Sequence, residues 1–325
     1  MKLGRRTFMH LSAGAAALPA ISRLAWAQTY PARPVRIIVG FAAGGLTDIT
    51  ARLIGQQLSD RLGRQFIVEN RPGAGTNVAT EAVANARPDG YTFLLATSSN
   101  AINATLYERL TFNFVRDLDP VGSIVDAPHI MEVNPSFPAR TVSAFITYAK
   151  ANPGKINFAS AGIGSSSHVT GELFKMMAGV NMIHVPYRGS SPAITDVIGG
   201  QVQVTFDPIA SSIEYIRAGK LRALAGTGKR RLDVLPDIPI MSDFLPGFEA
   251  SAWQGLCAPK NTPPAIILKV NSEINAALGD QKLKAQLQEL GLAVLSGSPA
   301  DFGKLIAKDT EKWAKVIRFL GVKAD

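Results

Sequence analysis

The stretch Val35–Asp48, VRIIVGFAAGGLTD, decides the fold. Its first part, Val35–Val39, is a short run of apolar and mostly β-branched residues, which is typical of a buried strand. Gly44 and Gly45 end this run, and apolar residues then recur at helical spacing from Leu46 to Leu62. The stretch therefore predicts a strand, a glycine-rich turn and a helix in direct succession.

The same succession recurs along the chain in two runs, which Pro120 separates. Strands are expected at residues 66–68, 91–96, 156–159, 182–185, 202–206 and 221–225. Helices are expected between them, including one at residues 77–86 and one from residue 167. A further helix is expected to begin at Ser191, with Pro192 at its first position. Alternating strands and helices indicate an α/β fold with largely parallel sheets, and two runs predict two lobes.

The segment beyond Trp253 is mostly helical, with helices expected up to residue 278, around 282–290 and over 299–320. It has too few strands for a third lobe, so we expect it to pack on the first. The chain would then cross between the lobes near residues 125–134 and 249–258, which predicts a cleft that closes on a ligand. The predicted lobe 1 comprises residues 28–128 and 253–325, and lobe 2 comprises residues 129–252.

Residues 1–27 have the features of an export signal peptide. A basic start precedes a short apolar run, and Ala25-Trp26-Ala27 provides a cleavage site. Arg5 and Arg6 are typical of a twin-arginine signal, and an ordinary Sec signal is the alternative. We therefore expect a periplasmic protein, cut near Ala27.

The charge balance at first suggests a polyanionic partner. The 325 residues include 34 Lys and Arg against 25 Asp and Glu, a net charge of +9. Removing residues 1–27 takes away four basic residues and no acidic ones, which leaves a balance of +5. The one basic triple, Lys229–Arg231, has no interleaved aromatic residues and is interpreted as a solvated turn. We therefore expect no nucleic-acid partner.

After residue 27 the sequence has few cysteines and histidines, and it lacks the common motifs of catalytic and metal sites. The single cysteine, Cys257, excludes an internal disulfide and a multi-cysteine metal site. His129, His168 and His184 lack metal-ligand spacing, and no G-x-S-x-G motif occurs. We therefore expect no enzyme, no metal and no cofactor. An exported hydrolase or isomerase that uses Ser167 and His168 is the enzymatic alternative, although neighbours at a helix start do not face each other.

Two glycine-rich loops are better candidates for chemistry, as sites that bind an anion. Phe41–Asp48 and Ser160–His168 each follow a predicted strand and lead into a helix, whose unpaired N–H groups and dipole favour negative charge. One loop from each lobe could hold one carboxylate from both sides. The alternative is that both loops are ordinary turns with capping residues. The candidate contacts are Phe41, Ala42, Ala43, Gly44, Gly45, Thr47, Asp48, Ser160, Ala161, Gly164, Ser165, Ser166 and His168.

Several motifs together resemble the Bug family of periplasmic solute receptors, the substrate-binding proteins of tripartite tricarboxylate transporters. The similarity covers nearly all of the chain after residue 27. The matching stretches are VRIIVGFAAGGLTD (35–48), VENRPGAG (68–75), PDGYTFL (88–94), residues 155–174 with the core SAGIGSSSH (160–168), HVPYRGSS (184–191), DVIGGQVQVTFD (196–207), AGKLRALA (218–225) and residues 263–274.

The resemblance implies a two-lobed, type II-like flytrap fold that closes on a small organic carboxylate and delivers it to membrane permease subunits. It implies that Tyr187, Arg188 and Asp207 line the second side of the cleft. It also implies that the segment 97–103, with Ser98 and Asn100, shapes the distal end.

We expect a monomer, and a co-receptor for a sensor kinase is the functional alternative. This sequence departs from the family where Ala42-Ala43 replaces a proline-containing pair, where Arg188 replaces lysine and where Pro208 replaces asparagine. The last departure alters a wall of the expected pocket.

Overall fold

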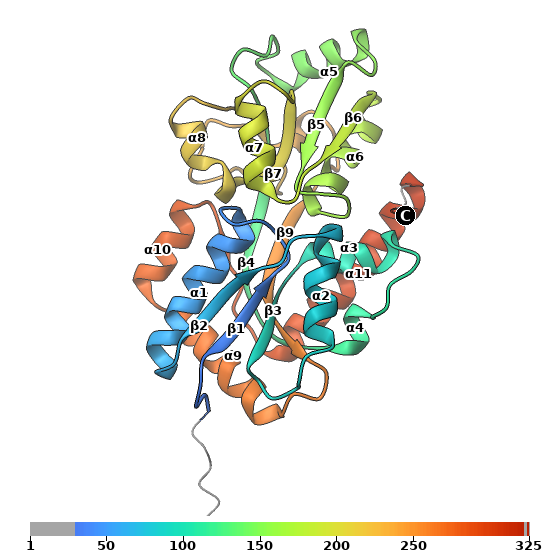
Figure 1. The fold of residues 1–325 in the computed structure, drawn as a ribbon. Coiled ribbons are helices and arrows are strands. Elements are labelled where there is room, and N and C mark those ends of the chain that lie inside the picture. The colour runs from blue at the N-terminus through green and yellow to red at the C-terminus, as the bar shows by residue number, and fades with distance from the viewer. Residues whose placement is uncertain (1–29, 322–323, 325) are drawn as a thin grey trace, which may run out of the picture.

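The structure, a computed structural model, describes residues 30–321 and residue 324, so the predicted signal peptide lies outside the described residues. Two lobes lie one above the other, and two long strands run between them (Figure 1). The strands form one path in the order β2-β1-β3-β9-β4-β7-β5-β6, and β8 and β10 both pair with β4.

The first lobe is built on three parallel strands. These are β1 (Val35–Val39), β2 (Phe66–Asn70) and β3 (Thr92–Thr97). Its helices are α1 (Leu46–Leu62), α2 (Asn77–Ala84), α3 (Ser98–Leu106) and α4 (Phe114–Asp117). The chain returns to this lobe for α9 (Pro264–Leu278), α10 (Gln281–Glu289), the short strand β10 (Ala293–Val294) and α11 (Pro299–Leu320).

The second lobe repeats the architecture. Its parallel strands are β5 (Ile156–Ser160), β6 (Met182–Pro186) and β7 (Val204–Pro208), and β8 (Arg222–Gly226) pairs with β4. Its helices are α5 (Val142–Ala151), α6 (Ser166–Ala178), α7 (Ser190–Ile198) and α8 (Ile213–Arg217). The strands and helices predicted from periodicity are therefore present, with ends that differ by a few residues.

The start of α7 differs from the prediction. The helix begins at Ser190, so Pro192 is its third residue and not its first. Gly189, with φ of +156°, sets the earlier start. Proline is tolerated at the third position because a first-turn amide has no acceptor within the helix in any case.

The two crossings between the lobes are strands. β4 (Leu118–Val133) pairs antiparallel with β9 (Ser251–Pro259) in the first lobe and with β7 in the second. The sequence predicted the crossings but no strand over residues 118–133. Its prolines and glycine broke the apolar pattern, and the structure accommodates them by shifts of register between Pro120 and Gly122 and between Ser123 and Val125.

Each lobe has its own apolar core. The core of the first lobe includes Ile37, Phe93 and Ile274, all fully buried. The core of the second lobe is rich in aromatic residues, and Phe174 packs against both Phe145 and Phe206 in it. Separate cores allow each lobe to keep its shape when the cleft opens or closes.

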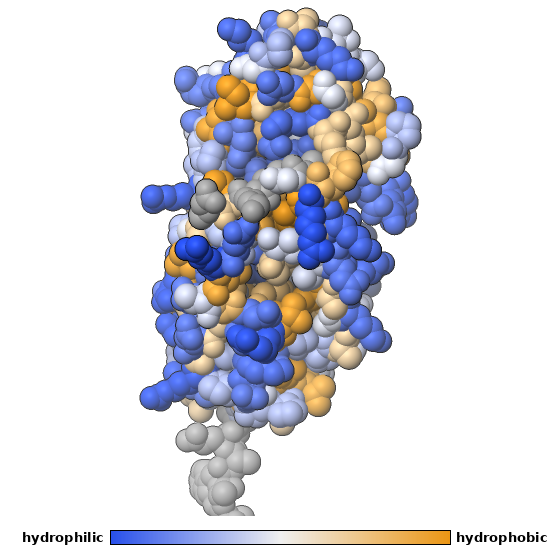
Figure 2. All heavy atoms as spheres, turned by 90° about the vertical axis from the view of Figure 1, so that its right-hand side faces the viewer, coloured by the Kyte–Doolittle hydropathy of each residue, from blue (hydrophilic) through white to orange (hydrophobic). Residues whose placement is uncertain are grey.

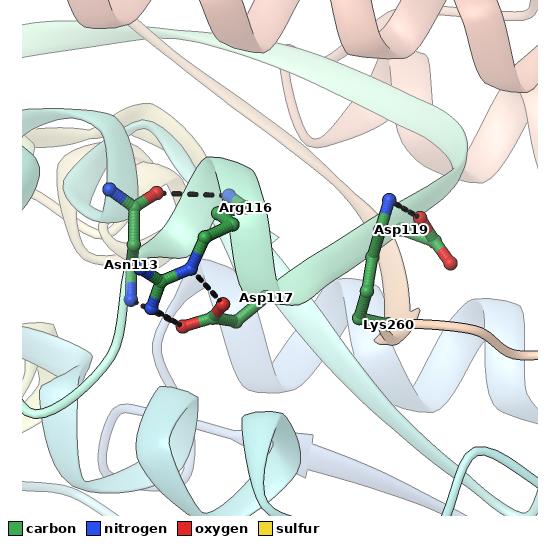
Figure 3. Close-up of polar contacts among 5 residues, drawn as sticks. All are labelled: Asn113, Arg116, Asp117, Asp119 and Lys260. Atoms are coloured by element: carbon green, nitrogen blue, oxygen red, sulfur yellow. Dashed lines mark hydrogen bonds and ion pairs between the residues drawn. The ribbon is translucent and has the colours of Figure 1, made fainter.

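Polar contacts fix the start of β4 (Figure 3). The side chain of Asn113 caps α4 by accepting a hydrogen bond from the Arg116 amide at 2.9 Å, and Asp117 pairs with the Arg116 guanidinium. Asp119, the second residue of β4, accepts a hydrogen bond from Lys260 Nζ at 2.7 Å. Lys260 directly follows β9, so this bond ties the start of β4 to the end of β9. The two crossing strands are therefore joined at their outer end.

The surface has a mixed character. On the face shown in Figure 2, apolar residues form separate patches among hydrophilic ones. Among the residues that the structure describes, no helix is both long and apolar enough to cross a membrane.

Candidate functional site

The two lobes touch each other across the cleft through the loops predicted as anion sites and their neighbours. The Ala42 amide donates to the Arg188 carbonyl at 3.0 Å. The Ser191 hydroxyl donates to the Ala43 carbonyl at 2.9 Å, and the Leu46 amide donates to Ser211 Oγ at 2.9 Å. These bonds join residues that are far apart in the sequence, and they close the cleft around its lining.

A cavity of about 30 Å³ lies between the lobes, which is room for about two water-sized groups. The starts of α1 and α6 both contribute to its wall. No charged side chain is among the described residues that line it. The lining residues are Phe41, Gly45, Leu46, Thr47, Thr97, Ser99, Ala161, Ser165, Ser166, Ser167, Ser190, Pro208, Ala252 and Gln254.

The loop of the first lobe is held in shape by Asp48. Its carboxylate accepts a hydrogen bond from the Gly44 amide at 3.0 Å and from Arg52 Nε at 3.0 Å. Burial opposes ionisation of Asp48, but the hydrogen bonds from Arg52 and Gly44 outweigh it and lower the pKa. Gly44 adopts φ of +85°, which glycine tolerates best. Asp48 therefore braces the turn and is itself neutralised by Arg52.

The loop of the second lobe is held by its own serines. Ser165 caps α6 by accepting a hydrogen bond from the His168 amide at 3.2 Å, and its hydroxyl donates to the Gly162 carbonyl at 2.7 Å. The Ala161 amide donates to Ser167 Oγ at 2.9 Å. The Gly164 amide donates to His168 Nδ1 at 3.3 Å, so Ser167 and His168 bond to different partners and form no nucleophile–base pair.

Two histidine rings support this loop from behind. His168 and His184 stack with centroids 4.1 Å apart, and His184 Nε2 lies 2.6 Å from Ser160 Oγ. Burial lowers the pKa of His168 to about 4 and the pKa of His184 to about 3. Both rings are therefore uncharged at neutral pH, and the loop offers an anion its backbone amides without a histidine charge.

A third helix start reaches the cavity, and the sequence interpretation missed it. Ser190, the first residue of α7, lines the cavity and donates a hydrogen bond to Asp207 Oδ1 at 2.9 Å. Asp207 is fully buried behind it and does not line the cavity. The signal was present, because Gly189 followed by Ser190 at a helix start has the same pattern as the two loops that were predicted.

The predicted contacts divide into lining and supporting residues. Phe41, Gly45, Thr47, Ala161, Ser165 and Ser166 line the cavity. A second cavity of about 180 Å³ shares Phe41 and Ala161 with it and is lined by Tyr187 and Arg188. The remaining predicted residues line neither cavity: Ala42, Ala43, Gly44, Asp48, Ser98, Asn100, Ser160, Gly164, His168 and Asp207.

Within the segment 97–103, the lining residues are not those that were predicted. Thr97 and Ser99 face the cavity, whereas Asn100 accepts a hydrogen bond from the Thr97 amide at 2.7 Å and so caps α3. Gln254, on the crossing strand β9, was also missed. It donates to Thr47 Oγ1 at 3.1 Å. A lone amide side chain in the otherwise apolar run Trp253–Ala258 was its only signal.

The arrangement suits one small anion. The first-turn amides of α1 and α6 have no backbone acceptors within their own helices. Side chains accept from two of them, since Ser211 pairs with the Leu46 amide and Ser165 with the His168 amide. Both helix dipoles place partial positive charge at the cavity. A carboxylate bound there would replace water without requiring a buried lysine or arginine.

Comparison with known proteins gives consistent results. A family model described as "Tripartite tricarboxylate transporter family receptor" matches residues 50–322. "Protein BugT" of Bordetella pertussis is 37% identical over 300 residues, which cover 91% of this chain and 92% of BugT. The structure of the periplasmic binding protein BugD is 35% identical with a TM-score of 0.88, covering 91% of this chain and all of that one.

Two further solved structures contain acids. A Rhodopseudomonas palustris protein with adipate is 34% identical with a TM-score of 0.88, covering 90% of this chain and 99% of that chain. MatC of the same organism, with bound malate, is 32% identical with a TM-score of 0.85, covering 89% of this chain and all of that one. These likenesses confirm the predicted two-lobed α/β architecture.

Proposed function

The chain belongs to the tripartite tricarboxylate transporter family of receptors, and on that basis we propose that it is a periplasmic solute-binding protein that captures a small organic carboxylate. One observation carries the proposal: a cavity lies between two lobes at the starts of α1 and α6, and none of the described residues that line it carries a charged side chain. The acids found in the adipate-bound and malate-bound relatives support the same class of ligand.

Capture proceeds by closure. A carboxylate first meets the free amides at the start of one helix in the open cleft. The second lobe then closes over it, and the bonds from Ala42, Leu46 and Ser191 form between the lobes. Because the ligand touches both lobes only in the closed form, it shifts the equilibrium toward closure. In this proposal residues 28–128 and 253–325 move as one lobe against residues 129–252.

The rest of the ligand would extend from the small cavity into the larger one. The two cavities share Phe41 and Ala161 in their walls, so they are direct neighbours, and the proposal places one part of the ligand in each. Tyr187 and Arg188 would then meet the distal part of the acid. We place the carboxylate in the small cavity, with Gly45, Thr47, Ser165 and Ser166 around it.

The family supplies the expected partners. We propose that the exported protein works as a monomer and delivers its ligand to the permease subunits of a tripartite tricarboxylate transporter. Residues 1–27, with Arg5 and Arg6, would direct export by the twin-arginine route and be removed near Ala27.

A screen of organic acids on the mature protein tests the proposal. Binding to the folded state alone raises the melting temperature, so at least one mono- or dicarboxylate should raise it. The variant Gly45→Val should abolish that rise, because a Cβ at residue 45 would lie 3.2 Å from Ser190 Cβ across the cleft. Gly279→Val is the matched control, since residue 279 lies at the end of α9, away from the cavity. Binding that survives Gly45→Val would contradict the proposed site.

A further inference from the structure

Two fully buried acids, Glu132 on β4 and Asp207 on β7, lie close together in the second lobe. In the antiparallel pairing of these strands Asp207 lies opposite Ile130, and Glu132 lies opposite Thr205. The two acids are therefore diagonal neighbours on one face of the sheet, a separation that a side chain as long as glutamate can span. The charge of Asp207 consequently acts directly on Glu132.

Most of the carboxyl oxygens of this pair have no hydrogen bond among the described residues. Both Oε atoms of Glu132 and Oδ2 of Asp207 are buried without a partner, whereas Asp207 Oδ1 accepts from Ser190 at 2.9 Å. Ser212 favours the ionised form of Glu132, but its hydroxyl donates to the Ile209 carbonyl. A buried carboxylate without partners is costly, and two adjacent ones are costlier still. The pair therefore keeps at least one proton.

The charged side chains on the elements around the pair have partners of their own. The strand β5 and the turn 209–211 carry no ionisable residue. On α6, α7, α8 and β8, and on α1 across the cleft, the contacts are Glu172 with Lys175, Asp196 with Tyr187, Glu214 with Arg217, Arg222 with the carbonyls of Pro135 and Phe137, and Asp48 with Arg52. Within the described part of the chain, no lysine or arginine forms an ion pair with either buried acid.

Nearby histidines and Arg188 do not balance the charge either. His129 lies on the opposite face of β4 from Glu132, beside Ser166, and burial lowers its pKa to about 4. His168 and His184 are likewise uncharged at neutral pH. Arg188 is exposed at the second cavity, where water screens its charge.

Asp207 is joined to the cavity through the serine that covers it. Ser190 lines the cavity and donates to Asp207, so a ligand atom bound at Ser190 would lie about 5 Å from the buried carboxyl, the span of two hydrogen bonds that meet at one oxygen. At that distance two negative charges repel each other strongly in a site from which water is excluded. The proposed anion site is thus backed by an acid, and the repulsion disappears when that acid holds a proton.

Closure of the cleft acts on Asp207 in the same direction. Ser190 and Ser211 both favour its ionised form, and both meet the first lobe. The Leu46 amide donates to Ser211 Oγ at 2.9 Å, and a Cβ built at Gly45 would lie 3.2 Å from Ser190 Cβ. In an open cleft these serines would meet water, which stabilises a carboxylate behind them. In the closed form burial raises the pKa of Asp207 to about 7, and a bound anion would raise it further.

We infer that the protein binds its carboxylate together with a proton, which the buried pair of Glu132 and Asp207 takes up from solvent as the cleft closes. The inference rests on the proposed function, which places the carboxylate in the small cavity. Glu132 holds one proton throughout, and ligand binding brings a second to Asp207 Oδ2, the oxygen without a hydrogen bond. The added O–H bond removes one negative charge from the pair, which balances the charge that one ligand carboxylate brings.

Isothermal titration calorimetry of the mature protein, in buffers of different ionisation enthalpy, counts the protons taken up on binding. The probes are malate, succinate, glutarate and adipate at pH 7, where their carboxyls are ionised. We expect uptake of about 0.5–1 proton per ligand and an affinity that falls about tenfold between pH 6.5 and 8. Binding without proton uptake overturns this inference and leaves the proposed function intact. If none of the acids binds, the proposed function and this inference both fail.

Variants of the two acids then locate the proton. Asp207→Asn keeps an acceptor for Ser190 but cannot take up a proton, so proton uptake should vanish and the affinity should no longer change with pH. Glu132→Gln imitates the neutral acid and should retain the uptake, because Asp207 is still present. Asp237→Asn, which changes an exposed carboxylate, is the control and should behave as the parent protein. Uptake that persists in Asp207→Asn contradicts the assignment.

Infrared spectroscopy tests the buried pair without any ligand. At pH 8 the parent protein should show the carbonyl band of a protonated carboxylic acid, and Glu132→Gln should lack it. A parent spectrum without this band would show that both acids are ionised, and the inference would then be wrong. If either variant fails to fold, the calorimetry and the infrared spectrum of the parent protein decide the matter.

Discussion

At the scale of single residues, the carboxyl of Asp207 affects the site without touching it. It lies fully buried behind Ser190 and faces Glu132 of β4, which is also fully buried. Burial raises the pKa of Asp207 to about 7, and burial together with the charge of Asp207 raises the pKa of Glu132. Two acids that resist ionisation therefore lie beside the cavity.

The stability of the protein should consequently depend on pH. In the unfolded chain Asp207 has its ordinary pKa of 3.8, so between about pH 4 and 7 the folded state binds more protons. The contribution of Asp207 to the free energy of unfolding should fall as pH rises through this window and level off above pH 7. Asp207→Asn should remove part of this fall, about 4 kcal/mol at most, because the shift spans about three pH units.

Urea unfolding at pH 5 and at pH 8 measures the effect. Asp233→Asn, which changes an exposed carboxylate, is the control and should keep the slope of the parent protein. An Asp207→Asn variant with the parent's pH dependence would show that the carboxyl ionises normally in the folded protein.

At the scale of elements, α11 is attached to the first lobe through Asp309. Asp309 Oδ2 accepts hydrogen bonds from Trp253 Nε1 of β9 at 2.7 Å and from Trp313 Nε1 of its own helix at 3.1 Å. Asp309→Ala should leave two indole N–H groups unpaired and cost about 2–3 kcal/mol of unfolding free energy. Asp309→Asn retains an acceptor and should cost less. Unfolding followed by tryptophan fluorescence checks both values, and equal losses would argue against the hydrogen bonds.

The loop before α6 contacts α3 of the other lobe at Gly164. Gly164 has φ of +80°, and a Cβ there would overlap the side chain of Asn103. Gly164→Ala should therefore destabilise the protein by about 1–2 kcal/mol through its backbone angle and should also weaken ligand binding by holding the lobes apart.

A double-mutant cycle separates the two effects of Gly164→Ala. Adding Asn103→Ala should relieve the overlap, so the two substitutions should be non-additive in ligand affinity. Strict additivity in affinity would show that Asn103 does not oppose the added methyl group.

The sequence predicted most helices and strands correctly, but it predicted fewer of the residues that line the cavity. The strand and helix of Val35–Leu62 followed directly from periodicity and two glycines, because both signals are local. β4 was missed as a strand because its partners, β9 and β7, lie far away in the sequence. Asp207 was predicted to line the cleft, but its contact with Ser190 was missed for the same reason, since only the folded chain brings the two side chains together.

At the scale of the whole molecule, closure should be measurable as a change of shape. Small-angle scattering should give a smaller radius of gyration with a saturating carboxylate than without one. Ser211→Ala removes the acceptor of the Leu46 amide across the cleft, so ligand affinity should fall about fivefold, as the loss of one hydrogen bond predicts. Ser143→Ala, which changes an exposed residue of α5, is the control. An unchanged radius on binding would rule out closure as the mechanism of capture.

One contact between the lobes joins main chain to main chain, from the Ala42 amide to the Arg188 carbonyl. Point mutation cannot delete this bond except by introducing proline at residue 42, because every other residue type supplies the same N–H and C=O groups. Substitutions at residues 42 and 188 other than proline at 42 therefore keep this hydrogen bond between the lobes, while neighbouring side chains can change. Such a receptor can exchange one nutrient acid for another over evolutionary time and still close around each in turn.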